Sequence, residues 1–207
     1  MNISDQQDLS SFSEAHYLVR AIRQQDLFEA AGILADSFPL NPEFLSWLIP
    51  IMRVGIHEDL RGRLWSASPH YACLVAVDVS RCAGHSDGSS APEDCLIGTV
   101  EVGLRHENSW QMRSHPYPYL SNLAVRQEYR CRGIGKKLLA TCERVVTGWG
   151  FQDLYLHVLE TNNSARQLYL KTGYCLEETH RGWGSYLFGQ PPRMLLHKAL
   201  EKKPSSY

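Results

Sequence analysis

The chain has 207 residues, a formal net charge of −1 and 43% hydrophobic residues, which suits one sizeable domain with its own core. The lack of a basic surplus argues against nucleic acid as a partner, so we expect any anion site to be local. No apolar run is long enough to span a bilayer, and we therefore expect no membrane partner.

The first residues, "MNISDQQDLSSFSEAH", are polar and partly acidic. They have neither the basic start and apolar core of a secretory signal nor the composition of a transit peptide. We expect a flexible lead-in over residues 1–15, a single domain over 16–201 and a short tail over 202–207.

Six cysteines are scattered at wide, irregular spacings with no C-x-x-C pair. This pattern favours free thiols in a cytoplasmic protein over a disulfide framework. A zinc site formed by Cys73, Cys82, His85 and Cys95 is the alternative, and the lack of closely spaced ligand pairs argues against it. We expect no metal and a cytoplasmic location.

Apolar periodicity and turn residues predict the secondary structure. In chain order the expected elements are a strand over 17–24, a helix over 26–37, a helix over 43–64 interrupted near Pro50, strands over 71–80, 95–104 and 119–125, a helix ending near 147, a strand over 153–160, a short helix within 162–173, and strands over 174–180 and 193–200. The 81–94 segment is far longer than a usual hairpin loop, and its role stays open. This order predicts a mixed sheet with helices on its faces, an α/β or α+β fold.

The stretch "EYRCRGIGKKLL" (128–139) combines a helical pattern with an unusual start. Arg130, Arg132, Lys136 and Lys137 gather where the helix dipole is already positive, and two glycines stand among them. A multiply charged anion seated on the backbone N–H groups of the first turn accounts for both features. The spacing fails the P-loop and the dinucleotide fingerprint, and leaves R-x-x-G-x-G.

At Arg130, Gly133 and Gly135 the sequence resembles the GCN5-related N-acetyltransferase (GNAT) superfamily, whose acetyl-CoA motif is Q/R-x-x-G-x-G/A. The stretch "LYLHVLETNNSARQLYLKTGY" is similar to the strand and helix that follow in that family. The resemblance covers residues 17–200. It implies a GNAT fold, with a central mixed sheet of about seven strands, about four helices, and fourth and fifth strands that splay apart.

The resemblance also implies where acetyl-CoA binds. Backbone groups of Leu123, Ala124 and Val125 would hold the pantetheine arm like an added strand. Asn162 would contact the pantetheine, with Asn163 and Ser164 close by. The expected pyrophosphate loop consists of Arg130, Cys131, Arg132, Gly133, Ile134, Gly135 and Lys136.

Direct acetyl transfer needs a neutral amine, a polarised carbonyl and a protonated leaving thiolate. By the resemblance, Tyr169 is the proton donor to the thiolate and also touches the cofactor, and N–H groups near Leu123 polarise the carbonyl. Many relatives place a glutamate where this chain has His157. One branch, which acetylates protein N-termini, pairs a histidine there with a tyrosine that corresponds to Tyr119. Imidazole suits base chemistry near neutral pH. Glu101, within a strand, is the alternative base.

The same branch lines its substrate pocket with a Phe-Pro-aliphatic turn, which Phe38, Pro39 and Leu40 match; Tyr119 would face this pocket too. These residues predict an N-acetyltransferase for protein N-terminal α-amines and, as an extension, lysine ε-amines. A small-molecule amine acetyltransferase (arylalkylamine, polyamine or aminoglycoside) and a non-catalytic acetyl-CoA sensor are the alternatives. The sequence leaves the acceptor and the oligomeric state open.

Overall fold

The computed structural model describes residues 17–37, 48–66, 68–82, 95–105, 115–180 and 191–201. The strands are β1 (Tyr17–Ala21), β2 (Tyr71–Asp78), β3 (Cys95–Arg105), β4 (Tyr117–Val125), β5 (Asp153–Leu159), β6 (Cys175–His180) and β7 (Arg193–Ala199). The helices are α1 (Leu27–Ser37), α3 (Leu48–Trp65), α4 (Val79–Cys82), α5 (Ile134–Gly148) and α6 (Asn163–Lys171), with short 3₁₀ helices η1 (Gln24–Asp26) and η2 (Gln127–Tyr129).

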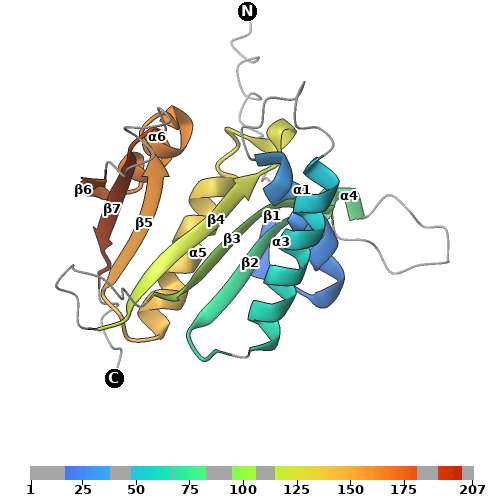
Figure 1. Ribbon diagram of the computed structural model, residues 1–207, viewed down its shortest axis with the longest axis horizontal. Helices are drawn as coiled ribbons and strands as arrows, with labels where there is room; N and C mark the ends of the chain where they lie inside the picture. Colours follow the sequence, from blue (N-terminus) through green and yellow to red (C-terminus); the bar gives the residue numbers. More distant parts are fainter. Residues whose placement is uncertain are drawn as a thin grey trace, which may run out of the picture.

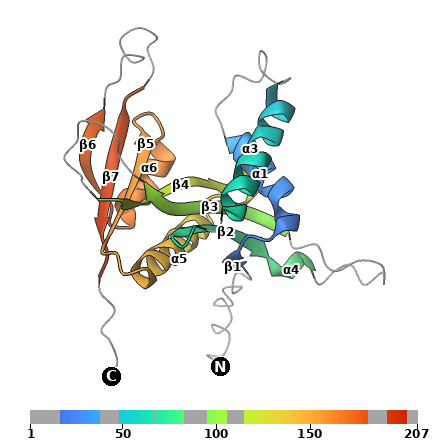
Figure 2. The same cartoon turned by 60° about the horizontal axis from the view of Figure 1, so that its bottom comes forward.

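The strands form one seven-stranded sheet in the order β1-β2-β3-β4-β5-β7-β6. Every neighbouring pair is antiparallel except β4 and β5. Helices α1 and α3 cover one face of the β1–β4 half, and α5 covers the other face (Figures 1 and 2). These observations confirm the predicted mixed α/β fold.

Two apolar clusters, one on each face of the sheet, hold the helices in place. Leu138 and Leu139 of α5 are fully buried in one cluster, and Leu60 of α3 is fully buried in the other. Strand β2 supplies both clusters by alternation, since Leu74 belongs to the first and Val75 to the second. Both faces of this part of the sheet are therefore buried, and for this reason its strands have nearly continuous apolar sequences.

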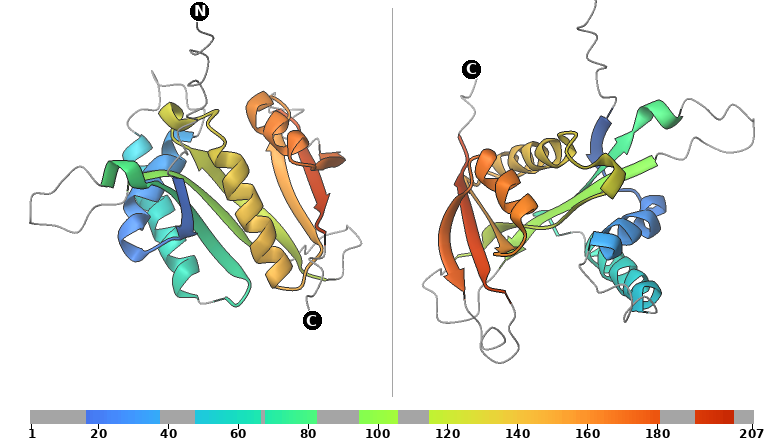
Figure 3. Two further views of the ribbon diagram at one scale, coloured as in Figure 1. Left: turned by 180° about the vertical axis from the view of Figure 1, so that it is seen from behind. Right: turned by 90° about the horizontal axis from the view of Figure 1, so that it is seen from above.

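Strands β4 and β5 pair over a short stretch only. Their parallel register contains two residue pairs, Tyr119 with Tyr155 and Leu120 with Leu156. Beyond these pairs the two strands diverge, as Figure 1 and the view from above in Figure 3 show. On its other side β5 pairs with β7 from Asp153 to Leu159. The predicted splaying of the fourth and fifth strands is confirmed.

The interruption predicted near Pro50 is not tested, because the residues before Leu48 lie outside the described residues. Helix α3 begins at Leu48 and runs unbroken to Trp65. Pro50 lies in the first turn, where backbone N–H groups have no acceptor within the helix, so its missing N–H removes no hydrogen bond. Residues 43–47 of the expected helix lie outside the described residues. Within the described part of the chain, no helix has the length and apolar composition needed to cross a bilayer.

Candidate active site

The turn between β4 and α5 leaves an open helix start. Gly133 precedes the first helical residue with φ of 80°, and no side chain caps the helix there. Cys131 also has a positive φ, 61°. No atom lies within 4 Å of the position that a Cβ at Gly133 would occupy. The N–H groups of the first turn therefore have no side-chain cap, and uncapped N–H groups at a helix start are suited to bind an anion.

The cations of this turn divide into two kinds. Arg130, Arg132 and Lys136 are exposed at the helix start, and the Nε of Arg130 donates to the carbonyl of Val125 at 3.1 Å. Lys137 instead donates to the carbonyl of Tyr17 in β1. Arg132 also forms a hydrogen bond with Tyr17. Arg132 and Lys137 thus join the start of α5 to β1, and Arg130 and Lys136 lie exposed beside them.

The two glycines of the motif serve different purposes. A Cβ at Gly135 would lie 3.0 Å from Cδ2 of Leu168, a residue of α6. Gly135 therefore allows α5 and α6 to approach closely, whereas Gly133 provides the left-handed turn. Helix α6 begins as predicted: the side chain of Asn162 accepts from the backbone N–H of Ala165 at 3.1 Å. Gly173, with φ of 91°, follows its end.

Strand β4 contains a bulge where it runs beside β3. The register changes between the pair of Thr99 with Ala124 and the pair of Glu101 with Ser121, so two residues of β4 stand opposite one residue of β3. One of the two, Asn122, has a φ of 54°. A bulge re-aims the groups that follow it. Here it turns the backbone around Leu123 away from regular pairing.

A buried carboxylate holds the bulge. Glu101 is 1% exposed, and its Oε1 accepts from Nδ2 of Asn122 at 2.5 Å. Its Oε2 accepts from the hydroxyl of Tyr71 at 2.7 Å and from Nη1 of Arg63 at 3.3 Å. Burial, and then the charge of Glu101, raise the pKa of Tyr71, so this phenol stays a donor. Both oxygens of Glu101 are therefore already engaged.

Tyr119 and His157 lie next to each other where β4 and β5 pair. The Tyr119 hydroxyl is 2.9 Å from Nδ1 of His157. The guanidinium carbon of Arg105 lies 3.7 Å from the centroid of the Tyr119 ring, and His180 of β6 lies 5.6 Å from His157 between ring centroids. The structure thus brings together the tyrosine and histidine that the sequence pairs, although 38 positions separate them.

Tyr169 projects from α6 into the core and is 6% exposed. Burial raises the pKa of its phenol, and the nearby Tyr119 adds to the increase. This hydroxyl is therefore protonated throughout the neutral range and is available as a hydrogen-bond donor.

A pocket of about 290 Å³ opens beside Tyr119. Its lining comes from the end of α3, the connection to β2, the end of β3 and the start of β4. The lining residues are Arg63, Ser66, Ser68, His70, Tyr71, Gly103, Leu104, Arg105, Tyr119 and Ser121. Of these, the sequence singled out Tyr119 only, because the others come from segments that meet through sheet pairing.

Some predicted residues cannot be compared. Phe38, Pro39 and Leu40 lie outside the described residues, as does His85 of the zinc alternative. Cys73 and Cys95 are free thiols, and the described residues contain no group of three metal-ligand side chains. Burial raises the pKa of Cys73 to about 12, so this thiol is a packed core residue.

Comparison with known proteins places these features in context. The sequence profile described as "Acetyltransferase (GNAT) family" matches residues 41–174. The chain is similar to the chloroplastic GCN5-related N-acetyltransferase 10 of Arabidopsis thaliana, with 34% identity over 64% of this chain and 51% of that protein. It is also similar to the thialysine N-epsilon-acetyltransferase of Bos taurus, with 31% identity over 68% of this chain and 78% of that protein. The chain spans 31–52% of the length of three chloroplastic relatives.

Among solved structures, the chain is similar to Arabidopsis thaliana NAA60 in complex with a bisubstrate analogue. The TM-score is 0.60 and the identity 25%, with 89% of this chain and 99% of that chain covered. The overall fold is therefore shared with a solved protein.

The network around Glu101 predicts a measurable coupling with Tyr71. In Glu101→Gln the amide has one accepting oxygen for three donors, Tyr71, Arg63 and Asn122, so we expect a loss of about 1–3 kcal/mol in the free energy of unfolding. Adding Tyr71→Phe removes one of those donors, so the double variant should lose less than the sum of the single variants. Urea denaturation measures all three.

The exposed Glu58 on α3 provides the control, and Glu58→Gln should change the unfolding free energy by no more than about 0.5 kcal/mol. A loss in Glu101→Gln no larger than in this control would contradict the assignment of Glu101 to the bulge.

Proposed function

Because the chain belongs to the acetyltransferase (GNAT) family, we propose that it transfers the acetyl group of acetyl-CoA to a primary amine of a protein. The preferred acceptor is the N-terminal α-amine, and the lysine ε-amine is a second one. The observation that carries the proposal is the Tyr119–His157 pair, which lies where β4 and β5 begin to diverge and beside the pocket.

The residues around the β4–α5 turn fit the acetyl donor. The unoccupied N–H groups at the start of α5 and the exposed cations Arg130, Arg132 and Lys136 suit a pyrophosphate. Backbone groups of Leu123–Val125, beside the bulge, have room to pair with the pantetheine arm because β5 has separated from β4 there. Helix α6, whose start is capped by Asn162, lies beside the end of β5 that has separated from β4 (Figure 1).

The chemistry then requires one bond to form and one to break. The amine nitrogen attacks the thioester carbonyl, whose oxygen is polarised by N–H groups around Leu123. The C–S bond breaks, Tyr169 donates a hydrogen bond to the departing thiolate, and the thiolate takes up a proton from solvent. His157, with Tyr119, accepts the proton that the new amide nitrogen loses and passes it to solvent. An α-amine, with a pKa of about 7.7–8.0, needs less help than a lysine near 10.4.

The choice of a protein acceptor follows from the Tyr119–His157 pair, which resembles the pair in the branch of the family that acetylates protein N-termini. The solved relative NAA60 carries a bisubstrate analogue. The alternative is a small amine, which the name of the thialysine relative favours. The cytoplasmic location stays a prediction, and imaging of the tagged full-length protein would test it against the chloroplast, where three relatives are named.

Acceptor preference is tested by thiol release from acetyl-CoA. The panel contains peptides with free N-termini, N-terminally blocked lysine peptides, and small amines. We expect the highest kcat/KM with a free N-terminus. A preference for the small amines would overturn the proposed acceptor, and acetyl-CoA binding without turnover on any of them would indicate a sensor.

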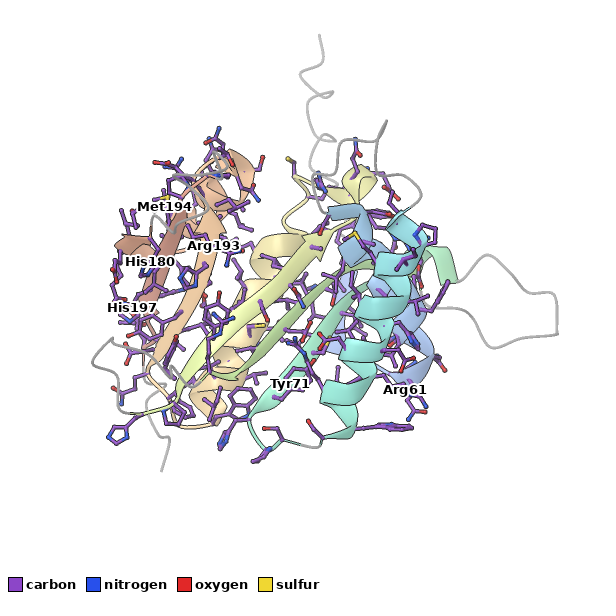
Figure 4. The ribbon with its side chains drawn as sticks, in the orientation of Figure 1. Arg61, Tyr71, His180, Arg193, Met194 and His197 are labelled. Atoms are coloured by element: carbon purple, nitrogen blue, oxygen red, sulfur yellow. The ribbon has the colours of Figure 1, made fainter. Side chains whose placement is uncertain are left out.

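The proposed base predicts a selective loss of rate. His157→Ala should lower kcat/KM on peptides by about 10²-fold and change the acidic limb of the pH–rate profile. Tyr119→Phe should have a smaller effect in the same direction. His197→Ala is a matched control, because His197 (labelled in Figure 4) lies on β7, where its Nε2 is 2.7 Å from Asp153 and its ring stacks on Tyr155 rather than on Tyr119 or His157. An unchanged profile in His157→Ala would remove this residue from the mechanism.

Two further variants should affect acetyl-CoA binding and the chemical step separately. Tyr169→Phe removes only the buried hydroxyl, so kcat should fall about tenfold or more while the acetyl-CoA Kd stays within about twofold. Gly133→Asp puts a carboxylate at a positive φ beside the anion site, so Kd should rise at least about tenfold. Calorimetry measures Kd, and steady-state thiol release measures kcat. The assignment fails if both variants change both constants equally.

A further inference from the structure

The pocket beside Tyr119 has a charge pattern that the proposed reaction does not require. Its described lining includes two arginines, Arg63 and Arg105, and no carboxylate. A pocket that only had to admit a cationic amine would be expected to carry the opposite sign. The arginines of the pocket would therefore contact a part of the acceptor other than its amine.

The charge of Arg63 is already balanced within the protein. Its Nη2 lies 2.8 Å from Asp59 one turn earlier in α3, and its Nη1 lies 3.3 Å from Glu101. Two carboxylates thus share one guanidinium. Arg63 lines the pocket and belongs to the network around the bulge. Because Asp59 and Glu101 compensate its positive charge, it attracts an anionic ligand only weakly.

Arg105 differs from Arg63 in this respect. It is exposed at the end of β3, and no carboxylate of the described residues forms an ion pair with it. Its guanidinium is nevertheless held in place by stacking on the Tyr119 ring at 3.7 Å. A stacked guanidinium is oriented in advance, and its planar fork suits a carboxylate.

One tyrosine side chain separates this cation from the proposed base. The guanidinium lies on the ring of Tyr119, and the hydroxyl of the same ring is 2.9 Å from His157. Consecutive residues of a peptide are about 3.8 Å apart between Cα atoms. An amine beside His157 would therefore put the side chain of the same or the adjoining residue within reach of Arg105.

We propose that Arg105 is a specificity residue that selects acceptors with an acidic side chain next to the reacting amine, such as a protein N-terminus with Asp or Glu in its first two positions. The proposal rests on the proposed function, because it assumes that the amine lies beside Tyr119 and His157. It names the partner by its chemistry: an acidic peptide segment.

The test compares matched peptides that differ in one group. Two free-N-terminus peptides carry Glu or Gln at the second position, two blocked peptides carry Glu or Gln beside a lysine, and free lysine represents a small amino acid. We expect the wild-type kcat/KM to favour Glu over Gln by roughly fivefold, the range of an exposed ion pair. The preference should weaken as salt is raised.

Variants then identify the residue responsible. Arg105→Gln should reduce the Glu-to-Gln ratio to about one, and Arg105→Lys should retain part of it because the charge remains. Arg61→Gln is the matched control: Arg61 also stacks on an aromatic ring, that of Trp65 at 4.4 Å, but on the outer side of α3, away from the labelled Tyr71 (Figure 4). This control should keep the wild-type ratio.

The outcomes separate the two proposals. Turnover on peptides with equal rates for Glu and Gln would overturn the role of Arg105 and leave the proposed function intact. No turnover on any peptide, with turnover on small amines, would overturn the proposed function itself. If Arg105 raised kcat/KM for free lysine but for none of the peptides, the proposal that it selects acidic peptides would be overturned.

Discussion

The short contact between β4 and β5 is the constraint on which the rest of the site depends. Two residue pairs join the strands, and beyond them the backbone of β4 has lost its neighbour. Unpaired N–H and C=O groups inside a protein are costly unless they find partners, so this gap favours a ligand that hydrogen-bonds as a strand does. The bulge at Asn122 turns the exposed edge, and the buried Glu101 keeps the bulge in one conformation. The proposed donor site and the proposed base lie at the two ends of this gap.

Positively charged side chains lie at both proposed ligand sites beside the gap, the acetyl-CoA site and the acceptor site. Exposed cations gather at the start of α5, where helix geometry already favours an anion. On the acceptor side, the buried carboxylate is neutralised by donors from three elements. The stacked guanidinium of Arg105 is the contrasting case, because the described residues supply no carboxylate for it. The paired charges around Glu101 thus hold the bulge, whereas Arg105 and the cations at the start of α5 lie where ligands are proposed to bind.

Local patterns in the sequence predict the elements well, because apolar periodicity and caps are short-range signals. The glycine turn, the cap at Asn162 and the partnership of Tyr119 with His157 all follow from motifs. The network around Glu101 does not, since it depends on a one-residue change of register between β3 and β4 and on residues up to 38 positions apart. Sequence alone treats Glu101 equally well as an exposed strand residue or a base, and the structure buries it. The pocket escapes prediction for the same reason, as its walls come from four separate segments.

The place of β7 in the sheet has a consequence for the order of folding. Strand β5 has two partners in β4 but seven in β7, which is also the only neighbour of β6 among the described strands. A nascent chain emerging from the ribosome would therefore assemble the β1–β4 platform with α5 before β5 gains its main support. His157 would reach its place beside Tyr119 only when residues 193–199 have been translated and inserted, so the last long-range pairing completes the part of the sheet that holds the proposed base.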